Sequence, residues 1–225
     1  MSLEIEEQTE HHRGRWLFGI VIFALVTAIG WYAYRWYTTG DLPPLPFLTA
    51  SAGASVDESD VNQEQISVHH VSAASPRYLS IQSLGIEKAR VRPVGLDTNN
   101  ILIFPDNIND VGWYEKSSLP GDGGVIIADG HNMGTTRSGV FAKLGTVAID
   151  DTILIERGDG KKFTYKVQEL IDMNIEEFVT NGMKMMAEPF KESKETLNIT
   201  TNNGKWVPRL GAFDSRILLR AIIAE

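Results

Sequence analysis

Short runs of alternating or wholly apolar residues recur along the chain after residue 77, and they predict β-strands separated by turns. Only residues 176–186 read as helical in this part of the chain, and residues 107–114 read as a short capped helix or a turn. Many short strands with few helices predict a mainly β fold, a closed or nearly closed β-barrel with short helices. The predicted strands are residues 78–81, 89–94, 125–128, 152–156, 161–170, 197–201 and 217–223.

The longest apolar stretch lies near the N-terminus. Residues 16–34 carry no formal charge, and a helix of this length crosses a bilayer core of about 30 Å. Aromatic residues lie at both ends, as is typical of headgroup interfaces. These two clusters argue against a buried core helix. The length of the stretch, with no small-residue cleavage site directly after it, argues against a cleaved signal peptide. We predict one transmembrane helix, an uncleaved anchor over residues 16–37.

The charges around this stretch predict its orientation. Arg13 and Arg15 precede it, whereas Arg35 alone follows it. Because positive charge is enriched on the cytoplasmic side of a membrane span, residues 1–15 are expected to form a cytoplasmic tail. The protein is then expected in the cell membrane as a single-pass protein, with most of the chain outside the cytoplasm.

Residues 38–75 lack apolar periodicity. They begin with a proline-rich run and continue with serine, alanine, aspartate and glutamine, a composition that predicts a flexible extracytoplasmic stalk. His69 and His70 lie in this segment, where adjacent histidines are more often solvated than bound to a metal. The folded barrel domain is expected to span residues 76–225.

The composition excludes several functions. The formal net charge of −8 argues against a nucleic-acid partner, because phosphate binding needs a dense positive surface. The 225 residues include no cysteine, which removes disulfides, thiolate metal sites and a cysteine nucleophile. The acidic residues are too scattered to predict a metal site, and the sequence predicts no cofactor.

Two residues near predicted strands are candidates for chemistry. His131 follows a buried strand and Gly130, where a side chain projects from the rim of a barrel. Arg216 opens the last predicted strand and shares a face with Leu218 and Arg220. Taken singly, each residue has an ordinary explanation, a loop hydrogen bond for the histidine and a solvated strand face for the arginine.

Taken together, however, the motifs from about residue 78 to residue 224 resemble a sortase. The resemblance covers the whole predicted barrel, and a single N-terminal anchor before an extracytoplasmic barrel also matches that family. The motifs include Tyr78-Leu79-Ser80-Ile81, Gly112-Trp113-Tyr114, Gly130-His131, Gly139-Val140-Phe141-Ala142-Lys143-Leu144, Leu197-Asn198-Ile199-Thr200-Thr201-Asn202 and Arg216.

The resemblance implies a transpeptidase that cuts the sorting signal of a surface protein and joins it to an amine of the cell wall or of a pilin. That reaction needs a thiolate nucleophile, a histidine that protonates the leaving amine, and a donor that stabilises the oxyanion. By resemblance, His131 matches the family's histidine and Arg216 its arginine. Asn202 stands where the family has its cysteine.

An asparagine amide is a poor nucleophile, so the family's ordinary mechanism is not available at position 202. Thr201 is expected to point to the opposite face of its strand, and Thr200 shares the face of Asn202 but lies two residues back. Other hydroxyl groups follow His131 in a loop, where such residues are more often turn formers. They are Thr135, Thr136 and Ser138.

Two functions therefore compete, and we favour the second. The chain is either an active transpeptidase or hydrolase with a serine or threonine nucleophile, or an inactive sortase that holds a peptide without cutting it. A third interpretation is an anchored polymer-binding barrel in which His131, Asn202 and Arg216 do not converge. Residues 203–215 are expected to form a loop beside the site, since they join the two strands that carry it. Thr200, Trp206 and Arg209 are the candidate substrate-binding residues, although the last two have an equally good role in packing this loop.

Overall fold

A computed structural model describes most of the chain. Contacts divide the chain into two units, one of residues 1–51 with 207–212 and one of residues 52–206 with 213–225. Each is described by itself. The described residues are 16–31, 33–34, 56–98, 101–190, 195–207 and 210–224.

In the first unit, residues 16–31 and 33–34 are helical, and their side chains are exposed. No helix within the described residues has both the length and the apolar character needed to cross a membrane. The predicted anchor includes Tyr32 and residues 35–37, which lie outside the described residues, as do the predicted tail and residues 38–55. The membrane span over residues 16–37 therefore stays a prediction.

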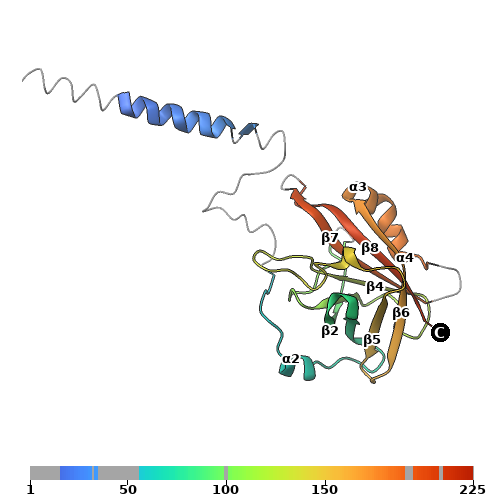
Figure 1. Cartoon of the computed structure of the whole chain (residues 1–225). Helices are drawn as coiled ribbons and strands as arrows, with labels where there is room; N and C mark the ends of the chain where they lie inside the picture. Colours follow the sequence, from blue (N-terminus) through green and yellow to red (C-terminus); the bar gives the residue numbers. More distant parts are fainter. Residues whose placement is uncertain are drawn as a thin grey trace, which may run out of the picture. The chain divides into compact units, whose positions relative to one another are not determined.

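The second unit is a closed barrel of eight strands (Figure 1). Around the barrel the strands run in the order β1-β2-β3-β4-β7-β8-β6-β5. This architecture confirms the mainly β barrel predicted from the alternating pattern. The strands are β1 (Pro76–Ile81), β2 (Ile86–Val94), β3 (Val111–Tyr114), β4 (Val125–Gly130), β5 (Thr152–Arg157), β6 (Lys162–Asn174), β7 (Thr196–Val207) and β8 (Ala212–Ile223).

Short helices connect the strands. The segment α3-η3-α4 runs between β6 and β7, where the pattern predicted a helix. Phe178 and Met186 of this segment pack with Met173 and Leu218 in a small apolar cluster separate from the larger barrel core. The helices are α2 (Gln63–Ser67), η1 (Gln82–Leu84), η2 (Leu144–Thr146), α3 (Ile175–Glu177), the π-helical η3 (Phe178–Gly182) and α4 (Met183–Ala187).

Two pairs of neighbouring strands are parallel, β2 with β3 and β4 with β7. Because parallel strands end at the same edge of a sheet, the C-terminal end of β4 and the residues that follow Thr200 on β7 lie at one rim of the barrel. The predicted site residues His131 and Asn202 both follow these points in the sequence. The topology thus gathers residues that are far apart in the chain.

Two local predictions need correction. Residues 107–110 form a turn, one of the two predicted alternatives, but Val111–Tyr114 is strand β3, which is mostly buried and pairs in parallel with β2. Residues 203–215 were expected to form a loop, but β7 continues to Val207 and β8 begins at Ala212. In both cases polar and glycine residues suggested a turn, and pairing with a neighbouring strand outweighed that local preference.

The predicted stalk is also wrong over residues 56–75, which we name the strap. The strap contains α2 and is held against the barrel. His69 is buried, and its Nε2 lies 3.0 Å from the carbonyl oxygen of Val91, so this histidine is not solvated. The side chain of Arg77 donates to the carbonyl oxygens of Ser67 and His69. The folded unit therefore begins well before residue 76.

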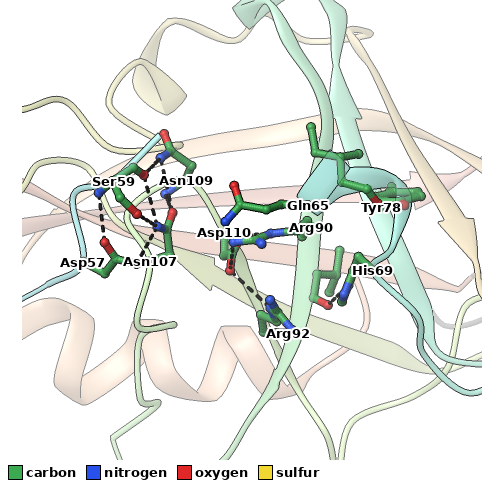
Figure 2. Close-up of polar contacts among 12 residues, drawn as sticks. Asp57, Ser59, Gln65, His69, Tyr78, Arg90, Arg92, Asn107, Asn109 and Asp110 are labelled. Atoms are coloured by element: carbon green, nitrogen blue, oxygen red, sulfur yellow. Dashed lines mark hydrogen bonds and ion pairs between the residues drawn. The ribbon is translucent and has the colours of Figure 1, made fainter. Parts of the chain in front are cut away.

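A buried ion pair fixes the loop that leads into β3. Arg90 donates from Nε and Nη2 to the two carboxylate oxygens of Asp110, at 2.7 and 2.9 Å. Arg92 adds a third contact of 3.2 Å, as Figure 2 shows. Asp110 and Arg90 are both almost fully buried. A two-pronged pair of this kind sets the geometry of the chain as well as compensating two buried charges.

We predict that Asp110→Ala lowers the free energy of unfolding by about 3–5 kcal/mol, because it leaves the buried Arg90 charge without its partner. Urea unfolding followed by circular dichroism measures the change. Asp106→Ala, at an exposed position of the same loop, is the control and is expected to change stability by less than about 0.5 kcal/mol. Equal stability of the two variants would contradict this account of the ion pair.

Candidate functional site

Alternation along β4 and β7 separates the barrel core from the site. Ile126 and Ala128 of β4 lie in the core, whereas Ile127 between them faces the other side and lines a cavity. On β7, Ile199 points into the core, and Thr200 lines the same cavity as Ile127. The outer face of these paired strands is therefore the floor of the candidate site.

His131 directly follows β4 and is held by the loop of residues 101–110. Its Nε2 lies 2.7 Å from the carbonyl oxygen of Pro105. Since a carbonyl oxygen only accepts, Nε2 carries the proton in this arrangement. Burial lowers the pKa of His131, and the hydrogen bond to Pro105 opposes that effect. The neutral imidazole is thus favoured at pH 7, with Nδ1 able to accept a proton.

Phe104 lies next to both predicted basic residues. Its ring centroid is 5.0 Å from that of His131, and the guanidinium carbon of Arg216 lies 5.6 Å from the same centroid. The guanidinium also lies 5.1 Å from the ring of Phe178. His131 and Arg216 therefore converge on one aromatic ring, contrary to the interpretation in which the site residues are dispersed.

Arg216 projects from the outer face of β8, because its neighbour Ile217 lies in the barrel core. Leu218, on the same face as Arg216, packs in the small cluster with Phe178. Burial lowers the pKa of Arg216, although a guanidinium stays charged at any ordinary pH. The aromatic rings beside it offer their negative faces to this cation.

The register of β4 and β7 indicates where Asn202 lies. The parallel pairing joins Asp129 to Thr200, an offset of 71 residues. Thr201 continues that offset, since its hydroxyl donates to the carbonyl oxygen of Gly130 at 2.7 Å. Asn202 and His131 come next with the same offset, so we expect them to lie at the same rim of the barrel.

Three of the five candidate hydroxyl groups donate hydrogen bonds to structural partners. Thr201 is buried and faces away from the side of Thr200, as expected. The hydroxyl of Thr200 donates to the carbonyl oxygen of Ile217 at 2.9 Å. In the loop after His131, the hydroxyl of Thr136 donates to Glu58. These hydrogen bonds hold the hydroxyls of Thr136, Thr200 and Thr201 to structural partners, whereas nucleophilic attack requires a neighbouring base.

An apolar cavity of about 210 Å³ opens beside Thr200 and Arg216. Its walls come from the outer face of β4 and β7, from the helical segment after β6, and from residues that follow β2. Such a cavity suits an apolar side chain, and its lining also includes the cation of Arg216 and two hydroxyl-bearing residues, Tyr114 and Thr200. It is lined by Leu96, Ile101, Leu102, Tyr114, Ile127, Ile175, Phe178, Val179, Met183, Met186, Thr200 and Arg216.

The other predicted substrate-binding residues have a different placement. Trp206 does not line this cavity, and its ring meets that of Phe213 edge-on at a centroid distance of 5.5 Å. This contact matches the packing role that the sequence left open for Trp206. Arg209 lies outside the described residues.

Asp129 is a feature of the site that the sequence interpretation missed. It lies two residues before His131 and is fully buried. Within the described residues, neither of its carboxyl oxygens has a hydrogen-bond partner. Burial raises its pKa to about 8, although the charge of Arg216 opposes the shift. The carboxyl group is therefore mostly protonated at pH 7 and leaves the positive charge of Arg216 largely uncompensated.

The space for this carboxyl comes from Gly112, which pairs with Asp129 on β3. A Cβ at Gly112 would collide with Oδ1 of Asp129. The Asp-Gly-His order was the only signal in the sequence, and Asp129 there reads as a turn residue. Phe104 was missed as well, because an aromatic residue before a proline suggests only a loop.

Among the described residues, no group of three or more histidine, cysteine, aspartate or glutamate side chains is arranged to hold a metal ion. The site therefore consists of an imidazole, a guanidinium, an amide and a buried carboxyl group around apolar walls. These groups can donate to a peptide carbonyl and exchange protons. Covalent peptide transfer by the family needs a thiolate, and the described residues supply none.

The sequence profile of the sortase domain family matches residues 79–221, more than half of the chain. The chain therefore belongs to the sortase family. This match covers every strand except the first residues of β1 and the last residues of β8, and it includes His131, Asn202 and Arg216. No curated protein sequence matches the chain.

Solved structures agree with this fold. A lid mutant of sortase A from Corynebacterium diphtheriae is 20% identical, with a TM-score of 0.50, and the match covers 72% of this chain and 76% of that one. Sortase C1 from Streptococcus suis is 19% identical, with a TM-score of 0.49 and coverage of 72% and 77%. At this identity, the likeness to the first structure establishes the barrel fold alone.

The buried Asp129 predicts an unusual dependence of stability on pH. A carboxyl group whose pKa rises from 3.8 to about 8 on folding binds its proton more tightly in the folded state. The contribution of Asp129 to the free energy of unfolding is then greatest below pH 4 and falls by up to about 1.4 kcal/mol per pH unit as pH rises towards 8.

Asp129→Asn keeps the shape of the side chain and removes its titration. Compared with the native chain between pH 4 and 9, this variant is expected to lose stability less steeply with rising pH. Urea unfolding at each pH measures both profiles, and their difference cancels the contributions of other groups. Parallel profiles would mean that folding does not raise the pKa of Asp129.

Proposed function

We propose that this chain is a membrane-anchored sortase-family protein that binds the sorting-signal peptide of a surface protein without forming a covalent intermediate. The main support for this proposal is the residue that stands at the family's nucleophile position. Asn202 aligns with His131 at the barrel rim, and the chain has no cysteine to take its place. An amide offers two donors and an acceptor, which suits holding a peptide carbonyl better than attacking it.

The surroundings of the site support binding. The cavity beside Thr200 has mostly apolar walls, and burying an apolar side chain contributes roughly 25 cal/mol per Å². Arg216 lines this cavity, and its positive charge is largely uncompensated because Asp129 is mostly protonated at pH 7. A guanidinium in a partly buried site is a strong donor to a carbonyl or carboxylate oxygen.

The same proposal includes location and partners. The predicted anchor over residues 16–37, which contains the uncharged stretch 16–34, holds the protein in the membrane, its N-terminus lies in the cytoplasm, and the barrel lies outside the membrane. There the barrel meets surface proteins that carry sorting signals, and amine groups of the cell wall or of a pilin are the acceptors that an active family member would use.

Restoring the thiol tests the proposal. We expect Asn202→Cys to ligate sorting-signal peptides to amine acceptors, because a thiolate beside His131 and Arg216 supplies the missing nucleophile. The native chain is expected to bind the same peptides and leave them intact. Mass spectrometry detects ligation, and calorimetry detects binding by the native chain.

Two double variants are the controls. Adding His131→Ala to Asn202→Cys is expected to lower the ligation rate by about 10² to 10⁴ fold, the usual contribution of a general acid or base. Adding Lys161→Ala, at an exposed turn between β5 and β6, leaves the rate unchanged. Ligation by the native chain would overturn the proposal in favour of a hydroxyl nucleophile. If the thiol variant is folded but inert, the assignment of the nucleophile position is wrong.

The absence of native cysteines allows a direct test of location. We predict that Lys161→Cys reacts with a membrane-impermeant maleimide on intact cells, whereas Thr9→Cys reacts only after the cells are permeabilised. Both variants react in detergent, which controls for accessibility of each thiol. Labelling of Thr9→Cys on intact cells would reverse the proposed orientation.

A further inference from the structure

The strap lies against both loops that carry the site. Asp57 pairs in parallel with Asn107 in the 101–110 loop. The amide of Asp57 donates to the carbonyl oxygen of Asp106, and the amide of Ile108 donates to the carbonyl oxygen of Asp57, both at 2.9 Å. The side-chain amide of Asn107 donates to Asp57 and Ser59, as Figure 2 shows.

The next residue of the strap, Glu58, contacts the other loop, residues 131–140. Its carboxylate accepts hydrogen bonds from the backbone amides of Thr135 and Thr136 and from the hydroxyl of Thr136. Arg137 donates to the carbonyl oxygen of Glu58 at 2.8 Å. A Cβ at Gly134 would collide with the carboxylate of Glu58, so the close fit of strap and loop depends on that glycine.

The two loops also meet at the site itself. Nε2 of His131, which begins one loop, bonds to the carbonyl oxygen of Pro105 in the other. Phe104, beside Pro105, stacks on the same imidazole. The orientation of His131 thus depends on how the two loops lie together. Two adjacent strap residues hold the loops in place, because Asp57 bonds to the 101–110 loop and Glu58 bonds to the 131–140 loop.

We propose that Glu58 is a positioning residue for His131. Glu58 does not touch the imidazole, and it acts by holding the 131–140 loop against the 101–110 loop so that His131 keeps its hydrogen bond and its burial. The inference rests on the proposed function only in treating His131 as part of the peptide site, because the placement of the imidazole can be measured without a peptide.

The test is the titration of His131 in the full-length chain in detergent micelles, followed by NMR with labelled histidine. The chain has five histidines, and the signal of His131 is the one that is lost in His131→Gln. In Glu58→Ala the loops are expected to separate and expose the imidazole, so the pKa of His131 rises towards its ordinary value of 6.5. Glu58→Gln keeps an acceptor oxygen and is expected to restore most of the native titration.

Glu64→Ala is the matched control, because it removes the same charge from an exposed position of the strap in α2. It is expected to leave the His131 titration unchanged. If Glu58→Ala does not fold, Thr136→Val removes only the hydroxyl donor to Glu58 and is expected to shift the titration in the same direction by less. A native titration in folded Glu58→Ala, or an equal shift in Glu64→Ala, would overturn the proposal. Ligation by Asn202→Cys tests the proposed function separately.

Discussion

The parallel pairing of β4 with β7 is the constraint on which the site depends. It joins segments 71 residues apart and ends them at the same rim of the barrel. One face of this pair forms the barrel core, and the other is the floor of the cavity. A slip of one residue in this register would exchange the two faces of the strand that slipped. The hydrophobic core therefore fixes the register of the paired segments that Asn202 and His131 directly follow.

The charges of the site follow from burial at this rim. At pH 7 the imidazole of His131 is mostly neutral and the carboxyl group of Asp129 is mostly protonated. The guanidinium of Arg216 remains a cation. A site with these protonation states carries a net positive charge and several donors. It is suited to the oxygens of a peptide backbone, and the chain has no cysteine to supply a thiolate.

Much of the barrel could be predicted from the sequence, because alternation reports which side of a strand is buried. The strands that were missed or cut short, β3 and the extended β7-β8 hairpin, carry glycine and polar residues, and only their neighbours in the sheet stabilise them. The strap was misread for a related reason. Its composition is that of a linker, but its polar groups find partners in two loops that follow it by about 50 and 80 residues.

The candidate site could be predicted in part. His131 and Arg216 were recognised through a family pattern, and the structure brings them together on Phe104. The contributions of Phe104 and Asp129 could not be read from local sequence. An aromatic residue in a loop and an aspartate before glycine have ordinary explanations until the fold shows what surrounds them.

The central claim is that this sortase barrel keeps a peptide-binding site without its nucleophile. The most direct measurement is NMR of the native full-length chain titrated with a sorting-signal peptide. The account predicts saturable shifts in the signals of Ile127, Met183 and Thr200 around the cavity, with the peptide recovered uncut. Unchanged signals at saturating peptide, or shifts confined to another face of the barrel, would contradict it.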